Sequence, residues 1–532
     1  MAIQAGAGVL AEQKPLHDGA AAKRGKNPFT SGFKTYVEGL LDEWKVAGMS
    51  IGVVDGDDVF TEGFGYAQLP DIPATSDTLW YVGSTTKAQL AATIAHFIDN
   101  KTYPELSAGW TTPISSILRD DFVLQDAYMT EHATLEDAVC HRTGMLDHTN
   151  AMPHVMADGR SATTRDHVRN MRNLPLTRTP RTEFHYNNWM FTTLSHVVET
   201  LTGEWLGDTL RKYLWEPLGM ENTFLSVEDA LASDKHLARG YYWDTEKDAF
   251  GEFPLWAAPE LSGAGIAISN VVDYTKWIRC LLRQEEPLSK AAHADIRLPR
   301  MLSDPVPAKG MEVGLYGLAW WRTTFHGQVL YHHTGSIPSH GAIVYWLPEL
   351  DYGLVAFHNY PDPMKRVVAM RLLEDRLEIP ESERYNISGV LHDEKDTARK
   401  LLDDPLDFLY PDQPETPLPP SFNNSDLVGR YHDAGYGTLT LREEPHPERA
   451  DETILVADRA DKSFQHSIHL HRVSGDYWVV YYYQQYESMN GPMDAHAAEF
   501  KAGVDGRPTG FEENVQPLGE VSHGIVFYEK VE

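Results

Sequence analysis

The hydrophobic pattern of the chain changes at a proline-rich segment, and this change divides the fold. Before it, apolar residues recur at helical spacing in several long stretches, including residues 84–100, 189–202 and 271–282. After residue 422 nearly every apolar run is short and strand-like, with turn residues between the runs. The sequence PDQPETPLPPSFNN, which separates the two parts, holds five prolines, and prolines oppose regular structure. The chain therefore combines an α+β part with a separate all-β part.

We predict four segments along the 532 residues. Residues 1–29 are rich in Ala, Gly and Lys without clear periodicity, which favours a flexible N-terminal arm. Residues 30–385 form the α+β domain, in which a helix from Phe33, a hairpin at Asp55–Asp58, a meander from about residue 328 and a helix at 364–377 are expected. Residues 386–422 read as a semi-rigid linker, and residues 423–532 as a small β-barrel.

Composition excludes several classes of partner. With 46 basic and 77 acidic side chains the net charge is −31, so nucleic acids and anionic membranes would repel the chain. No stretch approaches the roughly 20 apolar residues of a membrane helix, and no signal peptide is apparent. Cys140 and Cys280 are the two cysteines, and a single bridge or two free thiols both stay open. We expect a soluble, cytoplasmic protein.

Ser84 and Lys87 form the sharpest chemical motif. Three residues apart at the start of a buried helix, they lie one turn apart on one face, so the amine can reach the hydroxyl. A serine hydroxyl is a weak nucleophile until a base takes its proton, and burial at a helix N-terminus disfavours the charged form of lysine. Ser31 and Lys34 match the same pattern. They precede an ordinary amphipathic helix beside the arm, and we regard them as a chance match.

Two further motifs complete a constellation. Tyr186 and Asn188 stand just before the helix at 189–202. There a phenol held beside a lysine can have a lowered pKa and shuttle protons, and an amide can donate to a substrate carbonyl. A strand then ends in His333-Thr334-Gly335-Ser336, where small residues let a substrate approach and the main-chain N–H of Ser336 can stabilise an oxyanion. Arg142-Thr143-Gly144 resembles the last motif but follows a helix, so we set it aside.

In their order along the chain, these three motifs resemble the penicillin-recognising serine hydrolases, most closely the class C β-lactamase, D-alanyl-D-alanine carboxypeptidase and esterase branch. Similar flanking sequences extend the likeness over about residues 30–380, among them TLEDAVCHRTGM at 134–145 and LSGAGIAISNVVDYTKW at 261–277. The resemblance implies an antiparallel sheet flanked by helices, a helical subdomain and an active site between them.

The resemblance also implies roles for individual residues. Ser84 would be the acylated nucleophile, Lys87 its proton acceptor and Tyr186 the partner base. Asn188, His333, Thr334 and Gly335 would contact the substrate, and the main-chain N–H groups of Ser84 and Ser336 would form the oxyanion hole. For Lys87 to be neutral near pH 7, its pKa must fall by about 3 units from roughly 10.4. Acid should then inactivate the enzyme.

His333 departs from the pattern of β-lactamases and carboxypeptidases, which have lysine at this position. A neutral imidazole offers no permanent charge to a substrate carboxylate, and histidine here is similar to the esterase and acyltransferase members. We therefore expect a small-molecule acyl donor, an ester, thioester or amide without an essential carboxylate, and weak or no β-lactamase activity. No cofactor is indicated, and the choice between hydrolysis and acyl transfer stays open.

The C-terminal part resembles, by its strand spacing, the lipocalin-like barrels attached to some of these hydrolases. His466, His469 and His471 lie close together there, but no acidic or cysteine partner has matching spacing, so no metal site is predicted. Two other functions stay open: a non-hydrolytic isomerase or cyclase that uses Tyr186 or Lys87 as base, and an inert ligand-binding protein of the same fold. The sequence does not indicate the oligomeric state.

Overall fold

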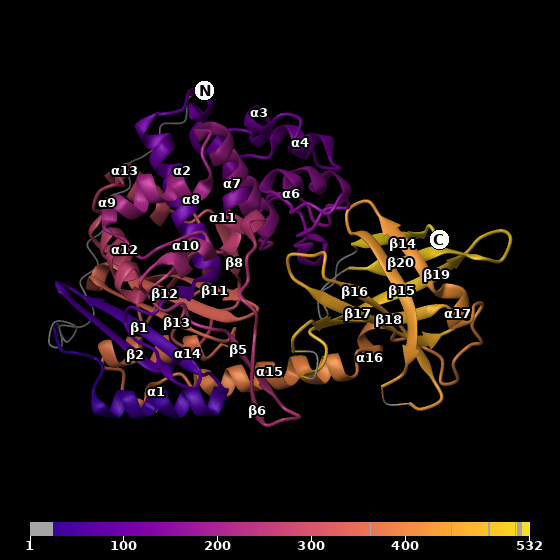
Figure 1. The fold of residues 1–532 in the computed structure, drawn as a ribbon. Helices are drawn as coiled ribbons and strands as arrows, with labels where there is room; N and C mark the ends of the chain where they lie inside the picture. The colour runs from indigo at the N-terminus through magenta and orange to yellow at the C-terminus, as the bar shows by residue number, and fades with distance from the viewer. Residues whose placement is uncertain (1–24, 362, 448, 488–489, 516–517, 519–523) are drawn as a thin grey trace.

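A computed structural model describes residues 25–361, 363–447, 449–487, 490–515, 518 and 524–532 (Figure 1). It contains a large α+β domain and a barrel that lies beside it, as the sequence predicts. Most of the predicted N-terminal arm, residues 1–24, lies outside the described residues. From Gly25 the chain leads into the fold, and Phe29 is already buried against Phe33 and Phe64.

A nine-stranded sheet, ordered β3-β2-β1-β13-β12-β11-β10-β9-β8, forms the centre of the large domain. The pairings are antiparallel, and the predicted hairpin at Asp55–Asp58 connects β1 to β2. The strands are β1 (Gly48–Asp55), β2 (Asp58–Gln68), β3 (Ile72–Pro73), β8 (Met301–Asp304), β9 (Gly314–Tyr316), β10 (Trp321–Phe325), β11 (Gln328–Ile337), β12 (His340–Leu347) and β13 (Tyr352–His358).

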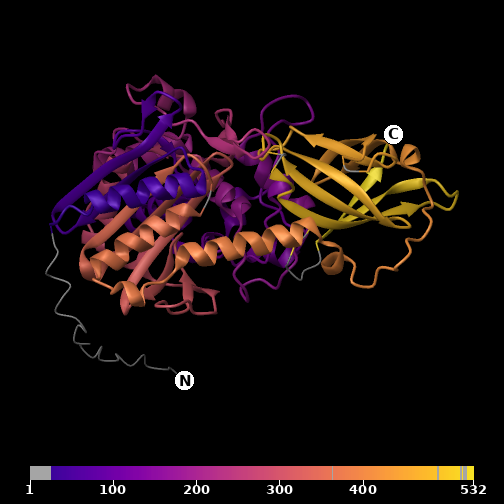
Figure 2. The ribbon, with the colours of Figure 1, turned by 90° about the horizontal axis from the view of Figure 1, so that it is seen from below.

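Helices cover both faces of this sheet, because its central strands are apolar on both sides. Alternate residues of β12 belong to two different cores: Ile343 and Tyr345 pack beneath α1 and α14, whereas Val344 and Trp346 face the larger core. The flanking helices are α1 (Ser31–Trp44) and α14 (Met364–Arg376) on one face and α2 (Thr86–Asn100), α7 (Asn188–Thr202) and α12 (Val271–Arg283) on the other. Figure 2, seen from below, shows α1 and α14 side by side in front of the sheet.

The remaining elements of the large domain are short and lie mostly between α2 and α14 in sequence. The helices are α3 (Ile114–Leu118), α4 (Ala127–His132), α5 (Leu135–Val139), α6 (Thr164–Asn170), α8 (Leu206–Leu210), α9 (Glu216–Leu218), α10 (Val227–Ala232), α11 (Ser262–Gly265) and α13 (Lys290–Arg297). Two small sheets pair β4 (Trp80–Tyr81) with β7 (Ile268–Ser269) and β5 (Tyr241–Asp244) with β6 (Ala249–Glu252).

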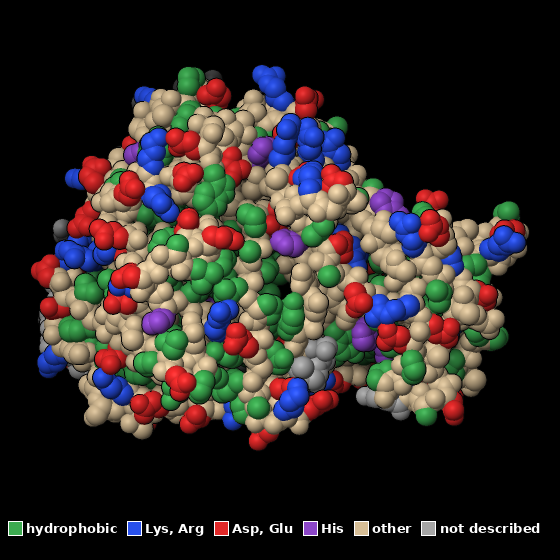
Figure 3. Space-filling model, in the orientation of Figure 1, with side chains coloured by type: hydrophobic (Ala, Val, Ile, Leu, Met, Phe, Trp, Pro, Cys, Tyr) green, Lys and Arg blue, Asp and Glu red, His purple; other side chains and the backbone are tan. Residues whose placement is uncertain are grey.

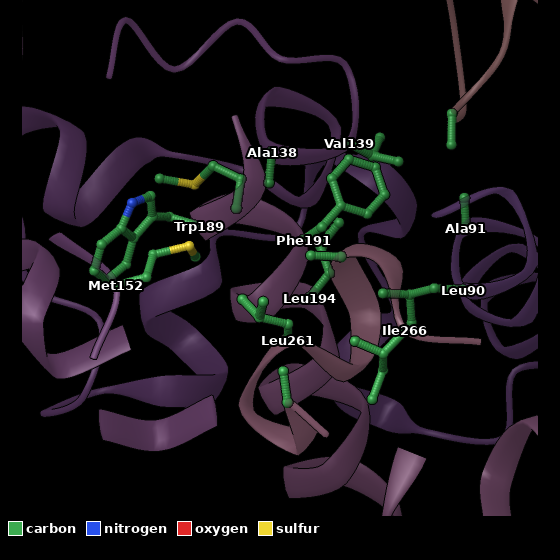
Figure 4. Close-up of a cluster of buried hydrophobic side chains, with 14 of the residues drawn as sticks. Leu90, Ala91, Ala138, Val139, Met152, Trp189, Phe191, Leu194, Leu261 and Ile266 are labelled. Atoms are coloured by element: carbon green, nitrogen blue, oxygen red, sulfur yellow. The ribbon is translucent and has the colours of Figure 1, made fainter. Parts of the chain in front are cut away.

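Helices α2, α7 and α11 share one apolar core. Leu90 of α2, Phe191 and Leu194 of α7, and Leu261 and Ile266 beside α11 gather there (Figure 4). Close backbone approach is part of this packing: a Cβ added to Gly263 would lie 2.5 Å from the Phe191 carbonyl oxygen. The core therefore fixes the N-terminal ends of α2 and α7 relative to α11, and these ends carry the first two sequence motifs.

The predicted linker differs from the observed structure in its first half. Residues 387–403 form a long helix, α15 (Ile387–Asp403), which the Asn386 side chain caps by accepting a hydrogen bond from the Gly389 N–H. Ile387 and Leu391 are buried against the large domain, and the helix runs on to the barrel (Figure 2). A short α16 (Leu406–Leu409) follows, and irregular chain occupies the proline-rich stretch that ends before α17 (Asn424–Leu427).

The C-terminal part is a closed antiparallel barrel of eight strands, which confirms the predicted barrel. Buried aromatic residues fill its interior, among them Tyr431, Trp478, Phe500 and Phe511. The strands are β14 (Gly429–Asp433), β15 (Gly437–Pro445), β16 (Thr453–Arg459), β17 (His466–Ser474), β18 (Tyr477–Gln484), β19 (Asp494–Ala502), β20 (Pro508–Asn514) and β21 (Ile525–Lys530).

The loop between β16 and β17 docks the barrel onto the large domain. The His154 N–H donates to the Asp461 carbonyl at 2.8 Å, and the Ser463 N–H donates to the Met152 carbonyl at 2.9 Å. Tyr436, in the turn just before β15, reaches the His148 ring with its hydroxyl, 2.8 Å from Nδ1. The barrel is therefore joined to the large domain by specific hydrogen bonds as well as by α15.

Charged side chains are spread over the surface of both domains (Figure 3). Acidic groups are visible across the whole of this face, in keeping with the net charge of −31. Among the described residues, no helix combines the length and the apolar character needed to cross a bilayer. Both cysteines are buried as free thiols, Cys140 and Cys280.

A buried ionic network lies inside the barrel. The two ring nitrogens of His496 face carboxylates, Nδ1 at 2.7 Å from Glu513 Oε1 and Nε2 at 3.2 Å from Asp494 Oδ2. Since a carboxylate accepts hydrogen bonds, both nitrogens must carry protons, which is the imidazolium form. Burial alone would lower the pKa of His496, but the hydrogen bonds to Asp494 and Glu513 outweigh it and raise the pKa to about 9.

We predict that deprotonation of His496 lowers the free energy of unfolding at high pH. A histidine whose pKa is raised on folding contributes stability that is complete below its unfolded pKa, near 6.5, and that disappears as pH rises through about 9. Between pH 6 and pH 10 the loss should be on the order of 3 kcal/mol. Urea unfolding of wild type and His496→Gln over this range measures it, because only the wild type should lose this contribution. Equal pH dependence in the two proteins would show that His496 is not charged in the barrel.

Candidate active site

Ser84 lies at the N-terminal end of the buried helix α2, where the sequence predicted it. A 3₁₀ turn, Gly83–Thr85, carries the serine and leads directly into the helix. The Thr85 hydroxyl donates to the Val82 carbonyl at 2.9 Å, and the Thr86 hydroxyl donates to the Gly83 carbonyl at 2.7 Å. These bonds fix the turn, so Ser84 is held half-buried at a cavity wall.

The Lys87 side chain is completely buried one turn after Ser84. Its Nζ atom lies 3.0 Å from Ser84 Oγ, 2.8 Å from Asn188 Oδ1 of α7 and 2.5 Å from the Ala264 carbonyl oxygen of α11. The rings of Tyr186 and Phe191 lie close to the same atom, with centroids at 4.9 and 5.2 Å. Three elements that are far apart in sequence thus converge on one amine.

This arrangement directs the lone pair of a neutral lysine. A neutral amine has two N–H groups and one lone pair. The Ala264 carbonyl and Asn188 Oδ1 can only accept hydrogen bonds, so they take the two N–H groups. The lone pair then points at Ser84 Oγ, whose hydroxyl proton it can receive. Burial lowers the pKa of Lys87 to about 7, opposed by the negative charge of Asp147, so the neutral form is well populated near neutrality.

Tyr186 lies against the same pair of groups. Its hydroxyl lies near the Ser84 side chain, which favours the charged form of the phenol, and its ring stacks on Trp321 with a centroid separation of 6.0 Å. The sequence pattern predicted a lowered pKa for this phenol, because a lysine stands beside it. Burial instead raises the pKa of Tyr186, because a phenolate would be poorly solvated there. Tyr186 is therefore a protonated phenol at neutral pH.

Asn188 bridges the lysine to a carboxylate that the sequence analysis did not identify. Its Oδ1 accepts from Lys87, its Nδ2 donates to Asp147 Oδ2 at 3.0 Å, and its backbone N–H donates to Asp147 Oδ1 at 3.1 Å. The Asn188 side chain, expected to bind a substrate amide, is thus engaged by protein groups at both polar atoms. It still lines the cavity together with Asp147.

The end of strand β11 closes the site opposite α2. Thr334 and Ser336 line the same cavity as Ser84. Gly335 allows the strand to approach, since a Cβ there would lie 2.1 Å from the Val82 carbonyl oxygen. Gly83 serves the same approach from the other side: its φ is +54°, and a Cβ would lie 2.6 Å from the Ser336 nitrogen. The main chain of Ser84 and that of Ser336 are thereby brought side by side.

His333 does not line this cavity. It is fully buried behind the wall, its ring 4.6 Å from that of Trp321. Its Nδ1 donates to the Thr334 carbonyl at 2.6 Å, so Nε2 accepts from the Tyr316 hydroxyl at 3.1 Å. Burial, with the nearby Lys87, lowers the pKa of His333 to about 3. The His333 imidazole is neutral, as the sequence predicted. It was expected to contact the substrate directly, but in the structure it lies behind the cavity wall and supports it.

The cavity has a volume of about 310 Å³ and includes residues that no local pattern indicated. Trp256 and Phe464 form part of its wall, with ring centroids 5.3 Å apart. Phe464 belongs to the barrel loop between β16 and β17. Trp256 Nε1 donates to the Ser463 carbonyl at 3.0 Å, and the Ser463 hydroxyl donates to Glu260 Oε1 at 2.7 Å. Both domains therefore build this one cavity.

The motifs that the sequence analysis set aside lie elsewhere. Ser31 begins α1 below the sheet and is exposed, and Lys34 pairs with Glu62 at 3.0 Å. Arg142 pairs with Glu136 and Asp137, both at 2.7 Å. In the barrel, the ring of His469 packs on Tyr483 and that of His471 on His446. No group of three or more metal-ligating side chains is found among the described residues.

Comparisons with known proteins agree with this architecture. The Unguisins hydrolase ungD' of Aspergillus campestris is 35% identical over 488 residues, which cover 91% of this chain and 89% of that protein. The D-aminopeptidase of Brucella anthropi is 24% identical over 439 residues, which cover 81% of this chain and 74% of that protein. The octameric penicillin-binding protein homologue from Pyrococcus abyssi superimposes with a TM-score of 0.58 at 20% identity, covering 93% of this chain and 99% of that one.

The family model described as Beta-lactamase matches residues 33–377, which include the whole nine-stranded sheet and, except for the first two residues of α1, its flanking helices. This range contains Ser84, Lys87, Tyr186 and the end of β11. On the strength of this match and of the fold, the chain belongs to the beta-lactamase family, with a closed eight-stranded barrel following the family domain.

Proposed function

We propose that the protein is a serine hydrolase that forms an acyl-Ser84 intermediate with an amide or ester substrate. The observation that carries this proposal is the buried Lys87 amine, whose two hydrogens are taken by Ala264 and Asn188 and whose lone pair faces Ser84 Oγ at 3.0 Å. A hydroxyl beside an uncharged amine, at the wall of a cavity of about 310 Å³, is an activated nucleophile.

Acylation begins with proton transfer from Ser84 to Lys87. As the Oγ–H proton moves to Nζ, Oγ forms a bond to the substrate carbonyl carbon, and the π electron pair moves onto the carbonyl oxygen. The Lys87 ammonium that results is stabilised by its three acceptors and by the negative charge of Asp147. The developing oxyanion would lie between the main-chain N–H groups of Ser84 and Ser336, at the positive end of α2.

Collapse of this intermediate requires a proton for the leaving group. Tyr186 is suited to relay it, since its protonated phenol lies near the Ser84 side chain and its ring centroid is 4.9 Å from Lys87 Nζ. The phenol would give its proton to the departing nitrogen or oxygen and recover one from the Lys87 ammonium. In deacylation, a water molecule loses a proton to the neutral Lys87 amine and attacks the carbonyl carbon of the acyl-Ser84 ester. The bond from that carbon to Ser84 Oγ then breaks, and Oγ takes the proton back from Lys87.

The wall of the cavity favours substrates without an essential carboxylate. His333 is neutral and lies behind the wall, so the charge that a lysine would provide at this position is missing. Aromatic and aliphatic side chains, among them Trp256, Leu261 and Phe464, supply apolar contact. Hydrolysis is supported by the names of two relatives, one a hydrolase and the other a D-aminopeptidase. β-Lactams that depend on a carboxylate contact should be poor substrates.

We predict that a fluorophosphonate forms a covalent adduct at Ser84. Intact mass should show one adduct on the wild type and none on Ser84→Ala, because the activated hydroxyl is the nucleophile. Ser31→Ala is the matched control, since Ser31 has the same spacing to a lysine but lies exposed at α1. Turnover of amides or esters that survives Ser84→Ala would instead favour chemistry in which Tyr186 or Lys87 acts as base.

We predict an acidic limit to acylation set by Lys87. Its pKa is lowered to about 7, so below this pH the amine is increasingly protonated and cannot accept the Ser84 proton. The rate constant for acylation by p-nitrophenyl acetate, measured from pH 5 to pH 9, should fall about tenfold per pH unit on the acid side. A rate that stays constant down to pH 5 would contradict a lysine base.

We predict that Gly83→Ala slows acylation about 100-fold or more. The added Cβ would lie 2.6 Å from the Ser336 nitrogen at a φ of +54°, so one side of the oxyanion hole must move. Gly39→Ala in α1 is the control, because nothing lies within 4 Å of its Cβ. The measurement is the rate at which the fluorophosphonate labels Ser84 in each protein, at a temperature well below the melting temperature of both variants, so that both are folded. A folded Gly83→Ala protein that labels at the wild-type rate would exclude this oxyanion hole.

A further inference from the structure

The active-site cavity carries one charged side chain in its described wall, the carboxylate of Asp147. The other lining residues are aliphatic, aromatic, hydroxyl-bearing or amide side chains and glycine. Lys87 lies behind the wall, and its pKa of about 7 leaves it largely uncharged in mildly basic solution. A substrate that enters the cavity therefore meets a negative group and no fixed positive one.

Within the described ranges, Asp147 has hydrogen-bond donors as partners but no cation. Thr149 donates its hydroxyl to Oδ2 at 2.7 Å, and Asn188 donates its Nδ2 to the same oxygen and its main-chain N–H to Oδ1. In the described part of the chain Asp147 forms no ion pair, since Asn188 stands between it and Lys87. The carboxylate is thus held in a fixed orientation while its charge stays uncompensated.

Among the residues that the structure describes, the neighbouring elements supply no counter-charge to Asp147 either. His148 donates Nε2–H to the Pro175 carbonyl and accepts the Tyr436 hydroxyl proton at Nδ1, which is the neutral tautomer. Burial lowers the pKa of His148 to about 4, and burial raises the pKa of the Tyr436 phenol. Behind the opposite wall, Lys365 donates to the Ser336 hydroxyl and the Pro361 carbonyl, and it does not line the cavity. Burial raises the pKa of Asp147, and the hydrogen bonds from Thr149 and Asn188 and the nearby Lys87 oppose this rise.

We propose that Asp147 binds a protonated amine of the substrate, so that the enzyme acts on acyl donors that carry an ammonium group near the scissile carbonyl. This inference rests on the proposed acylation of Ser84, because both residues line the same cavity. A half-buried carboxylate such as that of Asp147 gains a charge-assisted hydrogen bond when an ammonium reaches it, and the pair offsets the cost of desolvating each charge alone. The rings of Trp256 and Phe464 in the same wall offer aromatic faces that also favour a cation.

The test compares ligands that differ only in the amine. Both enantiomers of alanine p-nitroanilide carry the ammonium, and propionyl p-nitroanilide lacks it. Isothermal titration at pH 7 in a Ser84→Ala background measures binding without turnover. The alanine compound of at least one enantiomer should bind at least tenfold more tightly than the propionyl compound. Adding Asp147→Asn should abolish this preference, whereas Asp412→Asn, at an exposed position of the proline-rich stretch, should retain it.

Turnover by the full protein then separates the two proposals. With Ser84 present, Asp147→Asn should lower kcat/KM for the preferred alanine compound at least tenfold more than for the propionyl compound. Any change in the pKa of Lys87 affects both compounds alike, so the ratio isolates amine recognition. Absence of an amine preference in the titration, or its persistence in Asp147→Asn, would overturn the inference about Asp147. Amine-dependent binding without Ser84-dependent turnover would instead overturn the acyl-enzyme proposal and leave the amine site standing.

Discussion

The burial of the Lys87 amine is the constraint on which the arrangement of the site depends. Its three acceptors come from the helix of Ser84 itself, from the start of α7 and from α11. An amine without water must satisfy its hydrogens with protein atoms, so these elements have to meet at one point. Packing of Leu90, Phe191 and Leu194 in one apolar core holds these elements together. The same packing that stabilises the domain thus lowers the pKa of the lysine and directs its lone pair.

Local sequence patterns predicted the parts of the structure whose cause is local. The spacing of Ser84 and Lys87 indicated a shared helical face, and the apolar alternation after residue 422 indicated a barrel, both of which are observed. The helix α15 was missed because the prolines that follow it dominated the interpretation of residues 386–422. Asp147 and Phe464 were missed for another reason. Their positions in the cavity depend on contacts with residues far away in the chain, and single-residue types in loops give no signal of this kind.

The charge of the cavity follows from how each titratable group is buried. His333 is neutral because it is surrounded by rings and bonded at both nitrogens. Tyr186 is neutral because burial opposes the phenolate. Asp147 differs from both, since three donors stabilise its carboxylate while no cation pairs with it among the described residues. This cavity has a carboxylate in its wall and a lysine that is largely uncharged. A site that selects substrates by their carboxylate needs a positive group instead, so its charge is the opposite.

The barrel takes part in this electrostatic arrangement as well as in the shape of the cavity. Phe464 completes the wall, and Ser463 is anchored by Glu260 and Trp256 of the large domain. Tyr436 contributes from another loop of the barrel. Its hydroxyl donates to Nδ1 of His148, the residue next to Asp147, and this bond favours the neutral form of His148. If His148 were protonated, a cation would stand beside Asp147 and compete with a substrate ammonium. The barrel therefore helps to keep that carboxylate available, and its attachment to the large domain bears on substrate recognition through charge as well as through contact.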